Sequence, residues 1–293
     1  DGLDLSVAEG EIFGLVGPDG AGKTTTMRLL TAIMTPTSGE AWVAGRHIER
    51  ESETIKDEIG YMSQRFGLYP DLSVMENLNF YADIYSVPRR GRDEIMERLL
   101  GFSNLKPFKK RLAGNLSGGM KQKLGLSCAL VHKPKVLFLD EPTNGVDPVS
   151  RRDFWRILYQ LLKENVTIFV STAYLDEAER CNRVALLEEG RLLACGAPDG
   201  VRKLVRGAIV EVRVGDPRGA ARLLRAAMPD SSVGLFGNKV HIKTSDAEAT
   251  VRAADGILSG GGFGERSVRV TEPTLEDVFI SVLAERKRGE ARE

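Results

Sequence analysis

The segment GPDGAGKT at residues 17–24 constrains the fold of this chain more than any other feature. It fits the pattern G-x-x-x-x-G-K-[ST], which is typical of loops that bind phosphate groups. The apolar run at residues 12–16 predicts a buried parallel strand, and the segment from Thr25 onward predicts a helix. A glycine-rich turn before an ordinary helix is the alternative interpretation. The order of strand, glycine loop and helix favours a phosphate-binding loop.

Each part of this loop has a physical role in binding phosphate. Gly17, Gly20 and Gly22 allow tight turns that bring backbone N–H groups close to phosphate oxygens. The start of the following helix adds the positive end of its dipole. Lys23 would reach the β- and γ-phosphates, and the Thr24 hydroxyl would ligate Mg²⁺. The predicted binding residues of the loop are Gly17, Pro18, Asp19, Gly20, Ala21, Gly22, Lys23, Thr24 and Thr25.

Two acidic residues follow a second apolar run. The segment VLFLDEP at residues 136–142 predicts a strand that leads into Asp140 and Glu141. Carboxylates at the carboxyl end of a strand in a parallel sheet face the ligand crevice. Asp140 is therefore a candidate for the shell of Mg²⁺, and Glu141 is a candidate for accepting a proton from an attacking water. This motif is common on its own, and its combination with the phosphate-binding loop makes it specific.

Predicted strands and helices alternate along roughly the first 200 residues. This alternation predicts an α/β fold with a mostly parallel sheet flanked by helices, and with a helical insert between Gln64 and Ser117. The predicted strands are residues 12–16, 40–43, 59–63, 136–139, 166–171 and 184–187, and the predicted helices include residues 74–85, 94–100 and 150–164.

The pattern changes near Gly200, where a second domain is expected to begin. Its order β-α-β-β-α-β-α predicts a small α+β domain of the ferredoxin-like type. We therefore expect a first domain at residues 1–204 and an accessory domain at residues 205–293. The accessory domain shows no acids or histidines that converge in the sequence, so a role in dimerisation or regulation is expected. Its predicted strands include residues 209–214, 239–243 and 267–270, and its predicted helices are residues 218–228, 246–258 and 274–288.

Net charge and composition limit the kinds of binding partner that are expected for this chain. Lys and Arg together number 41, as do Asp and Glu, so the net charge is zero. Because nucleic-acid binding usually leaves a basic footprint, no nucleic-acid partner is expected. No apolar run approaches the roughly 20 residues that span a bilayer, so any membrane role is expected to be peripheral. Cys128, Cys181 and Cys195 show no C-x-x-C spacing, which is typical of a protein from a reducing cytosol.

A third motif, LSGGMKQ at residues 116–122, precedes another predicted helix. Ser117 would cap that helix, and the two glycines would leave N–H groups free for an anion. Alone, the motif predicts only a capped helix. Together, the phosphate-binding loop, Gln64, this motif, the two acids and Asp147 follow the order of the ATP-binding cassette family. The chain therefore resembles the ATP-binding subunits of ABC transporters over nearly its whole length.

This resemblance implies a P-loop NTPase cassette at residues 1–204, with a helical subdomain at about residues 65–133. It also implies ATP and Mg²⁺ as cofactors. In this family the glutamine joins Mg²⁺ and water to the transporter contact, and the Ser-Gly-Gly segment contacts ATP held by the opposite cassette. By position, the implied catalytic residues are Glu141, Gln64 and Lys23, the implied metal ligands are Thr24, Gln64 and Asp140, and the further implied nucleotide contacts are Ser117, Gly118 and Gly119.

The segment EPTLEDVF at residues 272–279 resembles the end of drug-exporter cassettes of the daunorubicin-resistance type. The resemblance implies an ATPase that powers export through a separate membrane-spanning permease. It places the chain in the cytoplasm, peripherally on the inner face of the cell membrane, and pairs it with a second cassette. A soluble cassette ATPase acting on ribosomes or DNA is the alternative. The coiled-coil insert or basic arm usual in that class is not seen between Gln64 and Ser117.

Two positions depart from the family pattern. Asp19 replaces the usual asparagine of the loop, and Ala173 stands at the position of the switch histidine in STAYLDEAE, residues 171–179. The Ser-Gly-Gly segment, in contrast, keeps the pattern. This imbalance predicts a non-identical partner cassette, either on a separate chain or fused after Glu293, so that this chain is the N-terminal cassette of a tandem protein. A second alternative is an ATP-binding half of an asymmetric pair that does not hydrolyse ATP.

Overall fold

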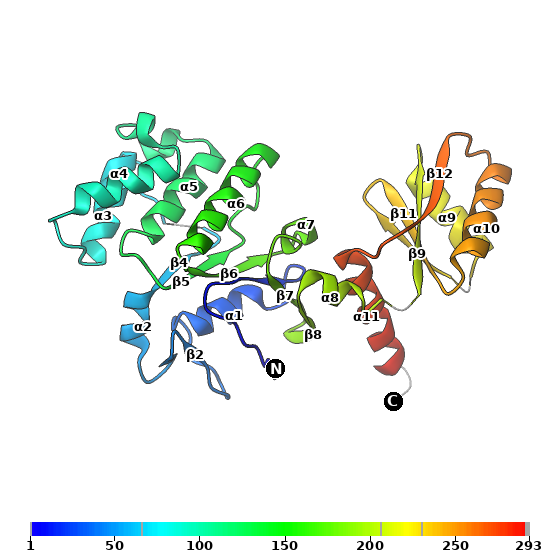
Figure 1. Cartoon of the computed structure of the whole chain (residues 1–293), viewed down its shortest axis with the longest axis horizontal. Coiled ribbons are helices and arrows are strands. Elements are labelled where there is room, and N and C mark those ends of the chain that lie inside the picture. The colour runs from blue at the N-terminus through cyan, green and yellow to red at the C-terminus, as the bar shows by residue number, and fades with distance from the viewer. Residues whose placement is uncertain (1, 66, 206, 230, 291–293) are drawn as a thin grey trace. The chain divides into compact units, whose positions relative to one another are not determined.

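The computed structural model describes residues 2–65, 67–205, 207–229 and 231–290. The chain forms two compact units, Asp1–Pro198 and Asp199–Glu293 (Figure 1). The elements of the first unit are β1 (Ile12–Val16), α1 (Lys23–Leu30), β2 (Trp42–Val43), β3 (Arg46–His47), α2 (Ser52–Glu58), β4 (Ile59–Met62), α3 (Val74–Ile84), α4 (Arg92–Phe102), α5 (Gly118–Ala129), β5 (Val136–Asp140), α6 (Pro148–Lys163), β6 (Thr167–Thr172), α7 (Leu175–Ala178), β7 (Arg183–Glu188) and β8 (Arg191–Gly196), with 3-10 turns at Lys106–Phe108 and Ala113–Asn115.

Six strands form the central sheet of the first unit, in the order β4-β5-β6-β1-β7-β8. All neighbouring strands are parallel except β7 and β8, which run antiparallel. The mostly parallel sheet predicted from the alternating elements is therefore confirmed. Because parallel strands end at the same edge of a sheet, the segments that follow β1, β5 and β6 come together at one edge.

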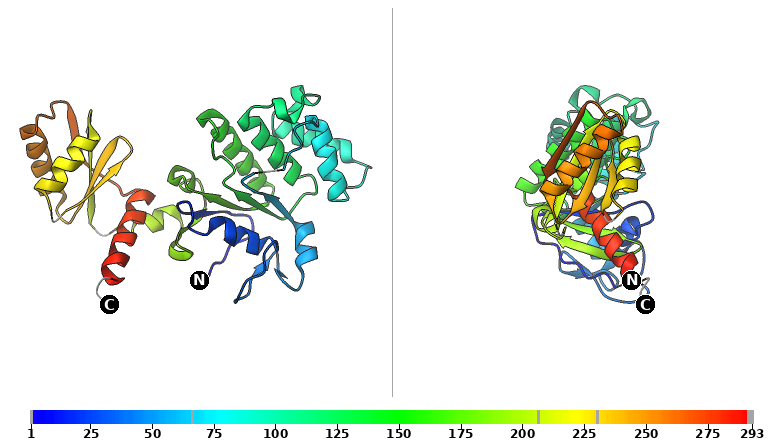
Figure 2. Two further views of the ribbon diagram at one scale, coloured as in Figure 1. Left: turned by 180° about the vertical axis from the view of Figure 1, so that it is seen from behind. Right: turned by 90° about the vertical axis from the view of Figure 1, so that its right-hand side faces the viewer.

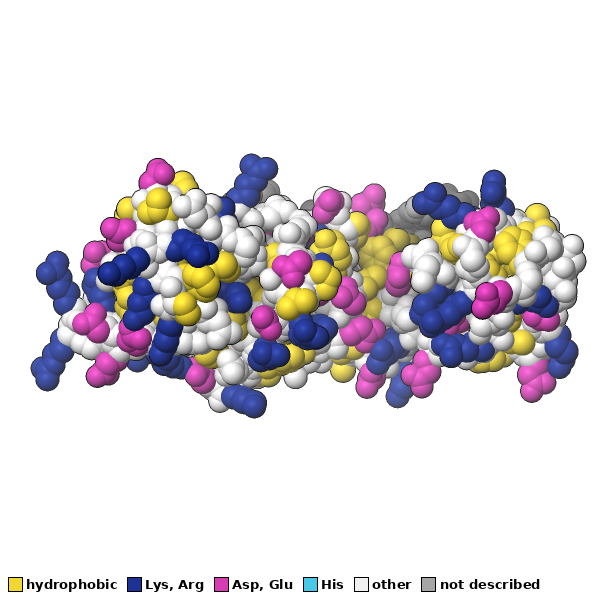
Figure 3. Space-filling view, turned by 90° about the horizontal axis from the view of Figure 1, so that it is seen from above, with side chains coloured by type: hydrophobic (Ala, Val, Ile, Leu, Met, Phe, Trp, Pro, Cys, Tyr) yellow, Lys and Arg dark blue, Asp and Glu magenta, His cyan; other side chains and the backbone are white. Residues whose placement is uncertain are grey.

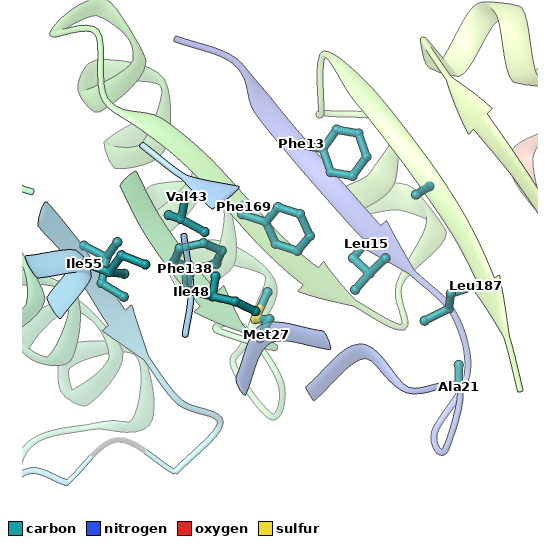
Figure 4. Close-up of a cluster of buried hydrophobic side chains, with 12 residues drawn as sticks. Phe13, Leu15, Ala21, Met27, Val43, Ile48, Ile55, Phe138, Phe169 and Leu187 are labelled. Carbon is teal, nitrogen blue, oxygen red and sulfur yellow. The ribbon is translucent and has the colours of Figure 1, made fainter. Parts of the chain in front are cut away.

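Three phenylalanines form a row across the middle of this sheet. Phe138 of β5 lies opposite Phe169 of β6, which in turn lies opposite Phe13 of β1. The ring centroids of neighbouring members are 5.5 and 5.4 Å apart, and Met27 of α1 belongs to the same buried cluster (Figure 4). Helix α1 covers one face of the sheet and α6 covers the other (Figures 1 and 2). This core fixes β1 and α1, and hence the loop between them.

The helical insert contains α3, α4 and α5. Ser73 caps α3 through a capping box in which its hydroxyl accepts from the Glu76 amide, while Glu76 accepts from the Ser73 amide. Asn77 is fully buried and bonds the backbone of Tyr69, Leu72 and Ser73. These bonds tie the segment that follows Gln64 to the start of α3.

Two strands differ from the sequence prediction. The strand expected at residues 40–43 is limited to β2, which pairs only with β3 in a two-stranded ribbon. Strand β8 was not predicted, because its sequence RLLACG lacks a clear alternation of apolar and polar residues. It joins the sheet as an antiparallel edge strand after a tight turn at Glu189 and Gly190, both of which have positive φ.

The second unit has a four-stranded antiparallel sheet in the order β10-β11-β9-β12. After the short helix α8, its element order is the predicted β-α-β-β-α-β-α, which is typical of ferredoxin-like domains. Helices α9 and α10 pack against the sheet around the buried Val210, Leu224 and Leu258. Its elements are α8 (Pro198–Arg202), β9 (Ala208–Val214), α9 (Pro217–Ala227), β10 (Ser232–Phe236), β11 (Lys239–Thr244), α10 (Ala247–Gly260), β12 (Arg266–Thr271) and α11 (Leu275–Glu290).

A buried histidine joins α11 to the sheet of the second unit. The Nδ1 atom of His241 on β11 lies 2.8 Å from Oδ1 of Asp277 on α11, and its Nε2 lies 3.7 Å from Oε2 of Glu211 on β9. The expectation that no acids or histidines converge in this domain is therefore wrong. The reason is that residues far apart in the sequence meet only through the sheet pairing and the docking of α11.

Replacing Asp277 by alanine should destabilise the second unit. Asp277 also accepts hydrogen bonds from the amide and hydroxyl of Thr274, which cap α11. Burial raises the pKa of Asp277, but hydrogen bonds from His241 and Thr274 outweigh it and lower the pKa overall. Ionised Asp277 therefore stabilises the folded state at pH values above the ordinary aspartate pKa. This stabilisation is lost as the pH falls through the lowered pKa of Asp277 in the folded protein. Leaving the buried Nδ1 of His241 without its hydrogen-bond partner should cost about 1–3 kcal/mol.

Hydrogen exchange of β11 and α11 amides is the measurement for this prediction, since both tryptophans, Trp42 and Trp155, lie in the first unit. The control is Asp255→Ala, which removes an exposed ion pair with Arg266 and should cost at most about 1 kcal/mol. Equal exchange in the two variants would contradict an anchoring role for Asp277.

Charges of both signs are interspersed over the face shown in Figure 3. Figure 3 shows lysine and arginine side chains mixed with aspartate and glutamate across the visible face. Within the described residues, no helix combines the length and apolar character needed to cross a membrane.

Candidate nucleotide-binding site

The phosphate-binding loop connects β1 to α1, and its backbone explains two of its glycines. A Cβ on Gly17 would lie 2.2 Å from the carbonyl oxygen of Leu187, so no larger residue fits. Gly22, the N-cap of α1, has a φ of 101°, which residues with a side chain rarely adopt. The first N–H groups of a helix lack partners within it, so this end of α1 is suited to bind an anion.

Lys23, the first residue of α1, is buried and directs its ammonium group back over the loop. Its Nζ donates to the carbonyl oxygens of Gly17 at 2.8 Å and Pro18 at 2.9 Å. It also forms an ion pair with Oε1 of Glu141 at 3.0 Å. These three oxygens match the three donors of an ammonium group. Lys23 thus links the loop to the carboxylate that follows β5.

Glu141 receives hydrogen bonds from two amide side chains in addition to this ion pair. Its Oε2 accepts from Nε2 of Gln64 at 3.0 Å and from Nδ2 of Asn144 at 3.2 Å. Glu141 has a φ of 48°, a left-handed conformation that is uncommon for residues other than glycine. Donors from three segments thus fix the position of the Glu141 carboxylate beside the phosphate-binding loop.

Asp140, the last residue of β5, is held by a serine that the sequence analysis missed. Ser171 lies opposite Asp140 on β6, and its hydroxyl donates to Oδ1 of Asp140 at 2.7 Å. The same hydroxyl accepts from the Glu141 amide at 3.0 Å. Within the described residues, Oδ2 of Asp140 is buried without a hydrogen-bond partner. A buried carboxylate oxygen without a partner is costly, so a divalent cation or its water shell fits this position.

A pocket borders Glu141 on the side of the segment that follows β6. Ala173 lines this pocket, and its methyl side chain has no donor for a hydrogen bond to phosphate. The pocket is lined by Asp19, Glu141, Thr143, Asn144, Thr172, Ala173 and Tyr174.

The Ser-Gly-Gly segment lies at the start of α5, in the helical insert, and no described contact joins it to the phosphate-binding loop. Ser117 caps α5 by accepting from the Met120 amide at 3.3 Å. A Cβ on Gly119 would lie 2.4 Å from Cβ of Ser150, so the glycine permits close packing of α5 on α6. Asp147 caps α6, and hydrogen bonds from Ser150 lower the pKa of Asp147.

The structure thus brings together one subset of the predicted site residues. Lys23 and Gln64 each contact the carboxylate of Glu141, and Ser171 links the Glu141 amide to Asp140. The sequence marks Ser171 only as the polar end of the predicted strand at residues 166–171, and it does not indicate Asp140 as its partner. The other loop residues lie on the same turn or on α1, and the functional roles of all of them stay predictions: Gly17, Pro18, Asp19, Gly20, Ala21, Gly22, Thr24 and Thr25.

Comparison with known proteins identifies the family. The profile of the ABC transporter family matches residues 1–144. The daunorubicin resistance ATP-binding protein DrrA2 of Streptomyces coeruleorubidus is 33% identical over 300 residues, covering 100% of this chain and 93% of that protein. The chain is an ATP-binding cassette of the ABC transporter family. The family resemblance drawn from the order of the motifs is confirmed.

Two further comparisons extend this result. The probable multidrug ABC transporter ATP-binding protein YbhF of Escherichia coli (strain K12) is 46% identical to this chain over 283 residues, which cover 96% of this chain. The chain spans 48% of that relative, about half its length. The dimeric structure of a post-hydrolysis state of the ATP-binding cassette MJ0796 bound to ADP and Pi matches with a TM-score of 0.60 at 25% identity, covering 66% of this chain and 88% of that one. The P-loop NTPase fold of the first unit is thereby confirmed.

Proposed function

We propose that this cassette binds Mg·ATP and hydrolyses it to power export through a separate membrane-spanning partner. The contact of Lys23 and Gln64 with Glu141, next to the phosphate-binding loop, is the observation that carries the proposal. Relatives named for multidrug transport and daunorubicin resistance support export as the process. Release of phosphate from ATP by the purified full chain is the experiment that tests it.

Different residues of this chain would have different roles in hydrolysis. The loop amides and Lys23 would bind the β- and γ-phosphates and neutralise charge that develops during phosphoryl transfer. Glu141 would accept the proton of the attacking water, and Gln64 would hold the carboxylate in place. In this arrangement Lys23 exchanges part of its contact with Glu141 for phosphate when ATP binds.

Mg²⁺ is part of the proposal because the oxygen donors around Asp140 suit it. Thr24, Gln64 and Asp140 would hold the ion, and the unpartnered Oδ2 of Asp140 is the observation in its favour. When bound, Mg²⁺ would neutralise charge on the β- and γ-phosphates.

A second cassette completes the proposed site. Ser117, Gly118 and Gly119 lie in the helical insert and have no described contact to the loop, so they are free to serve ATP bound by an opposite cassette. A related cassette has been solved as a dimer bound to ADP and Pi. Because Ala173 alters only the site on this chain's own loop, a non-identical partner is proposed. The membrane-spanning partner would receive the helical insert, at about residues 65–133, on the cytoplasmic face of the membrane.

Replacing Ala173 by histidine should raise the rate of ATP hydrolysis by this chain at least about tenfold. One hydrogen-bond donor aimed at transition-state charge is worth roughly 100- to 1,000-fold in a preorganised site, and a restored side chain should recover part of that. Steady-state phosphate release is the measurement. The control is Ala197→His, at another exposed alanine in the loop before α8. Equal rates for wild type and Ala173→His would show that this histidine is dispensable and would remove the reason for a non-identical partner.

The rival candidate is a cassette that binds ATP to complete a dimer without hydrolysing it. Ala173 favours this alternative, whereas the presence of a carboxylate, Glu141, beside the phosphate-binding loop favours hydrolysis. A soluble cassette that acts on nucleic acid has less support, because both signs of charge are mixed on the visible surface in Figure 3.

A further inference from the structure

Tyr174 follows Ala173 directly and lines the pocket beside Glu141. Its backbone N–H donates to the hydroxyl of Thr172 at 2.9 Å. The guanidinium of Arg151 lies over its ring, with Cζ 4.4 Å from the ring centroid. Such a cation–π contact is attractive because the ring face is negative. Tyr174 is therefore held at its backbone and on one face of its ring.

The hydroxyl of Tyr174 donates to Oδ1 of Asn144 at 3.4 Å. Asn144 in turn donates from Nδ2 to Oε2 of Glu141 at 3.2 Å. The side-chain amide of asparagine has an acceptor oxygen, Oδ1, on one side and a donor nitrogen, Nδ2, on the other. A 180° rotation of the amide group exchanges the positions of these two atoms. A donor at Oδ1 favours the orientation in which Nδ2 faces Glu141. The opposite orientation would place the amide oxygen against a carboxylate.

Arg151 is itself anchored to a buried carboxylate. Its Nε lies 3.4 Å from Oε1 of Glu177, whose side chain is fully buried. Glu177 also accepts from the hydroxyls of Thr143 and Thr172. Thr143 belongs to the turn after β5, and Thr172 ends β6. Glu177 therefore ties together the two segments that border the pocket and holds Arg151 against the tyrosine ring.

We propose that Tyr174 is a positioning residue for ATP hydrolysis, acting through Asn144 on the carboxylate of Glu141. The proposal rests on the ATPase function proposed above. Because Ala173 supplies no ring at the switch position, the orientation of Glu141 depends on the donors around it. Gln64 supplies one of them from the end of β4. The pair of Tyr174 and Asn144, which line the pocket, supplies another.

The first test is Tyr174→Phe, which removes the hydroxyl and keeps the ring beneath Arg151. We expect kcat for ATP hydrolysis by the full chain to fall roughly 3- to 10-fold, which is the worth of one ordinary hydrogen bond. KM for ATP should stay unchanged, because the hydroxyl acts on the carboxylate. The matched control is Tyr159→Phe on α6, where a tyrosine that is also 37% exposed donates to the carbonyl oxygen of Arg180 at 3.2 Å. Its kcat should equal that of the wild type.

The route through Asn144 is tested by a double-mutant cycle. In an Asn144→Ala background, Tyr174→Phe should cause no further loss of kcat. If the wild type is active and Tyr174→Phe has the same kcat, the positioning role of Tyr174 is overturned. The role is also overturned if the losses in kcat of the two single variants simply add in the double variant. A wild-type chain that releases no phosphate, in single or multiple turnovers, overturns the ATPase function and the positioning role with it.

Discussion

Lys23→Ala is expected to weaken binding of Mg·ATP by roughly 100-fold or more, because each hydrogen bond to a charged group is worth about 1.5–3 kcal/mol and Lys23 would make two to phosphate. Lys23 is buried over the loop, within 3.0 Å of Glu141 and within 2.9 Å of two loop carbonyls. No other described lysine is placed at the start of α1. Calorimetric titration of the full chain with Mg·ATP measures the loss.

The control for this prediction is Lys135→Ala. Lys135 is exposed and pairs with Glu58 at the opposite end of β4 and β5 from the loop. Its removal should leave the affinity for nucleotide unchanged. Equal affinities of the wild type and Lys23→Ala would refute the assignment of the phosphate-binding loop.

Glu141→Gln is expected to reduce ATP turnover by roughly 100- to 10,000-fold, the range typical of a general base, while binding of Mg·ATP is retained. Glutamine has nearly the same shape as glutamate but does not accept the proton of an attacking water. Loss of the ion pair should also free Lys23 for phosphate, so the affinity for ATP should not fall. Phosphate release and calorimetric titration together separate the two effects.

Glu189→Gln is the matched control for this variant. Glu189 also follows a strand of the same sheet and has the same φ of 48°, but its side chain is exposed. The Glu189→Gln variant should turn over ATP at the wild-type rate. A Glu141→Gln variant with wild-type turnover would exclude Glu141 as the base.

The sequence was sufficient to predict the first unit where the signals were local. The apolar run before Gly17, the glycines of the loop and the acids after residue 139 each lie within a few residues of one another. Their order along the chain also identified the family. The loop glycines are required by the close approach of Leu187 and by a left-handed φ, which is what the phosphate-loop pattern implies.

Contacts between distant segments were not accessible in this way. Ser171 meets Asp140 only because β6 pairs with β5 in one particular register. Tyr174 reaches Asn144 only because Glu177 and Arg151 hold the segment after β6 against the turn after β5. No spacing in the sequence fixes such pairings, since each depends on the packing of the whole sheet.

The second unit shows the same division. Its order of strands and helices followed from alternation and helical periodicity, and the sheet agrees with it. The burial of His241 against Asp277 did not follow, because 36 residues separate them and α11 brings the carboxylate to the sheet. A lone histidine in a strand is indistinguishable in sequence from a surface residue.

Hydrolysis in a single turnover tests whether this chain is itself an ATPase. The wild-type full chain, in molar excess over radiolabelled ATP, is incubated with Mg²⁺, quenched at intervals, and analysed for ADP and phosphate. We expect bound ATP to be converted to ADP and phosphate, and chelation of Mg²⁺ by EDTA to stop the conversion. Recovery of unchanged ATP from chains that hold it in the presence of Mg²⁺ would contradict the proposed hydrolysis and would identify a cassette that only binds nucleotide.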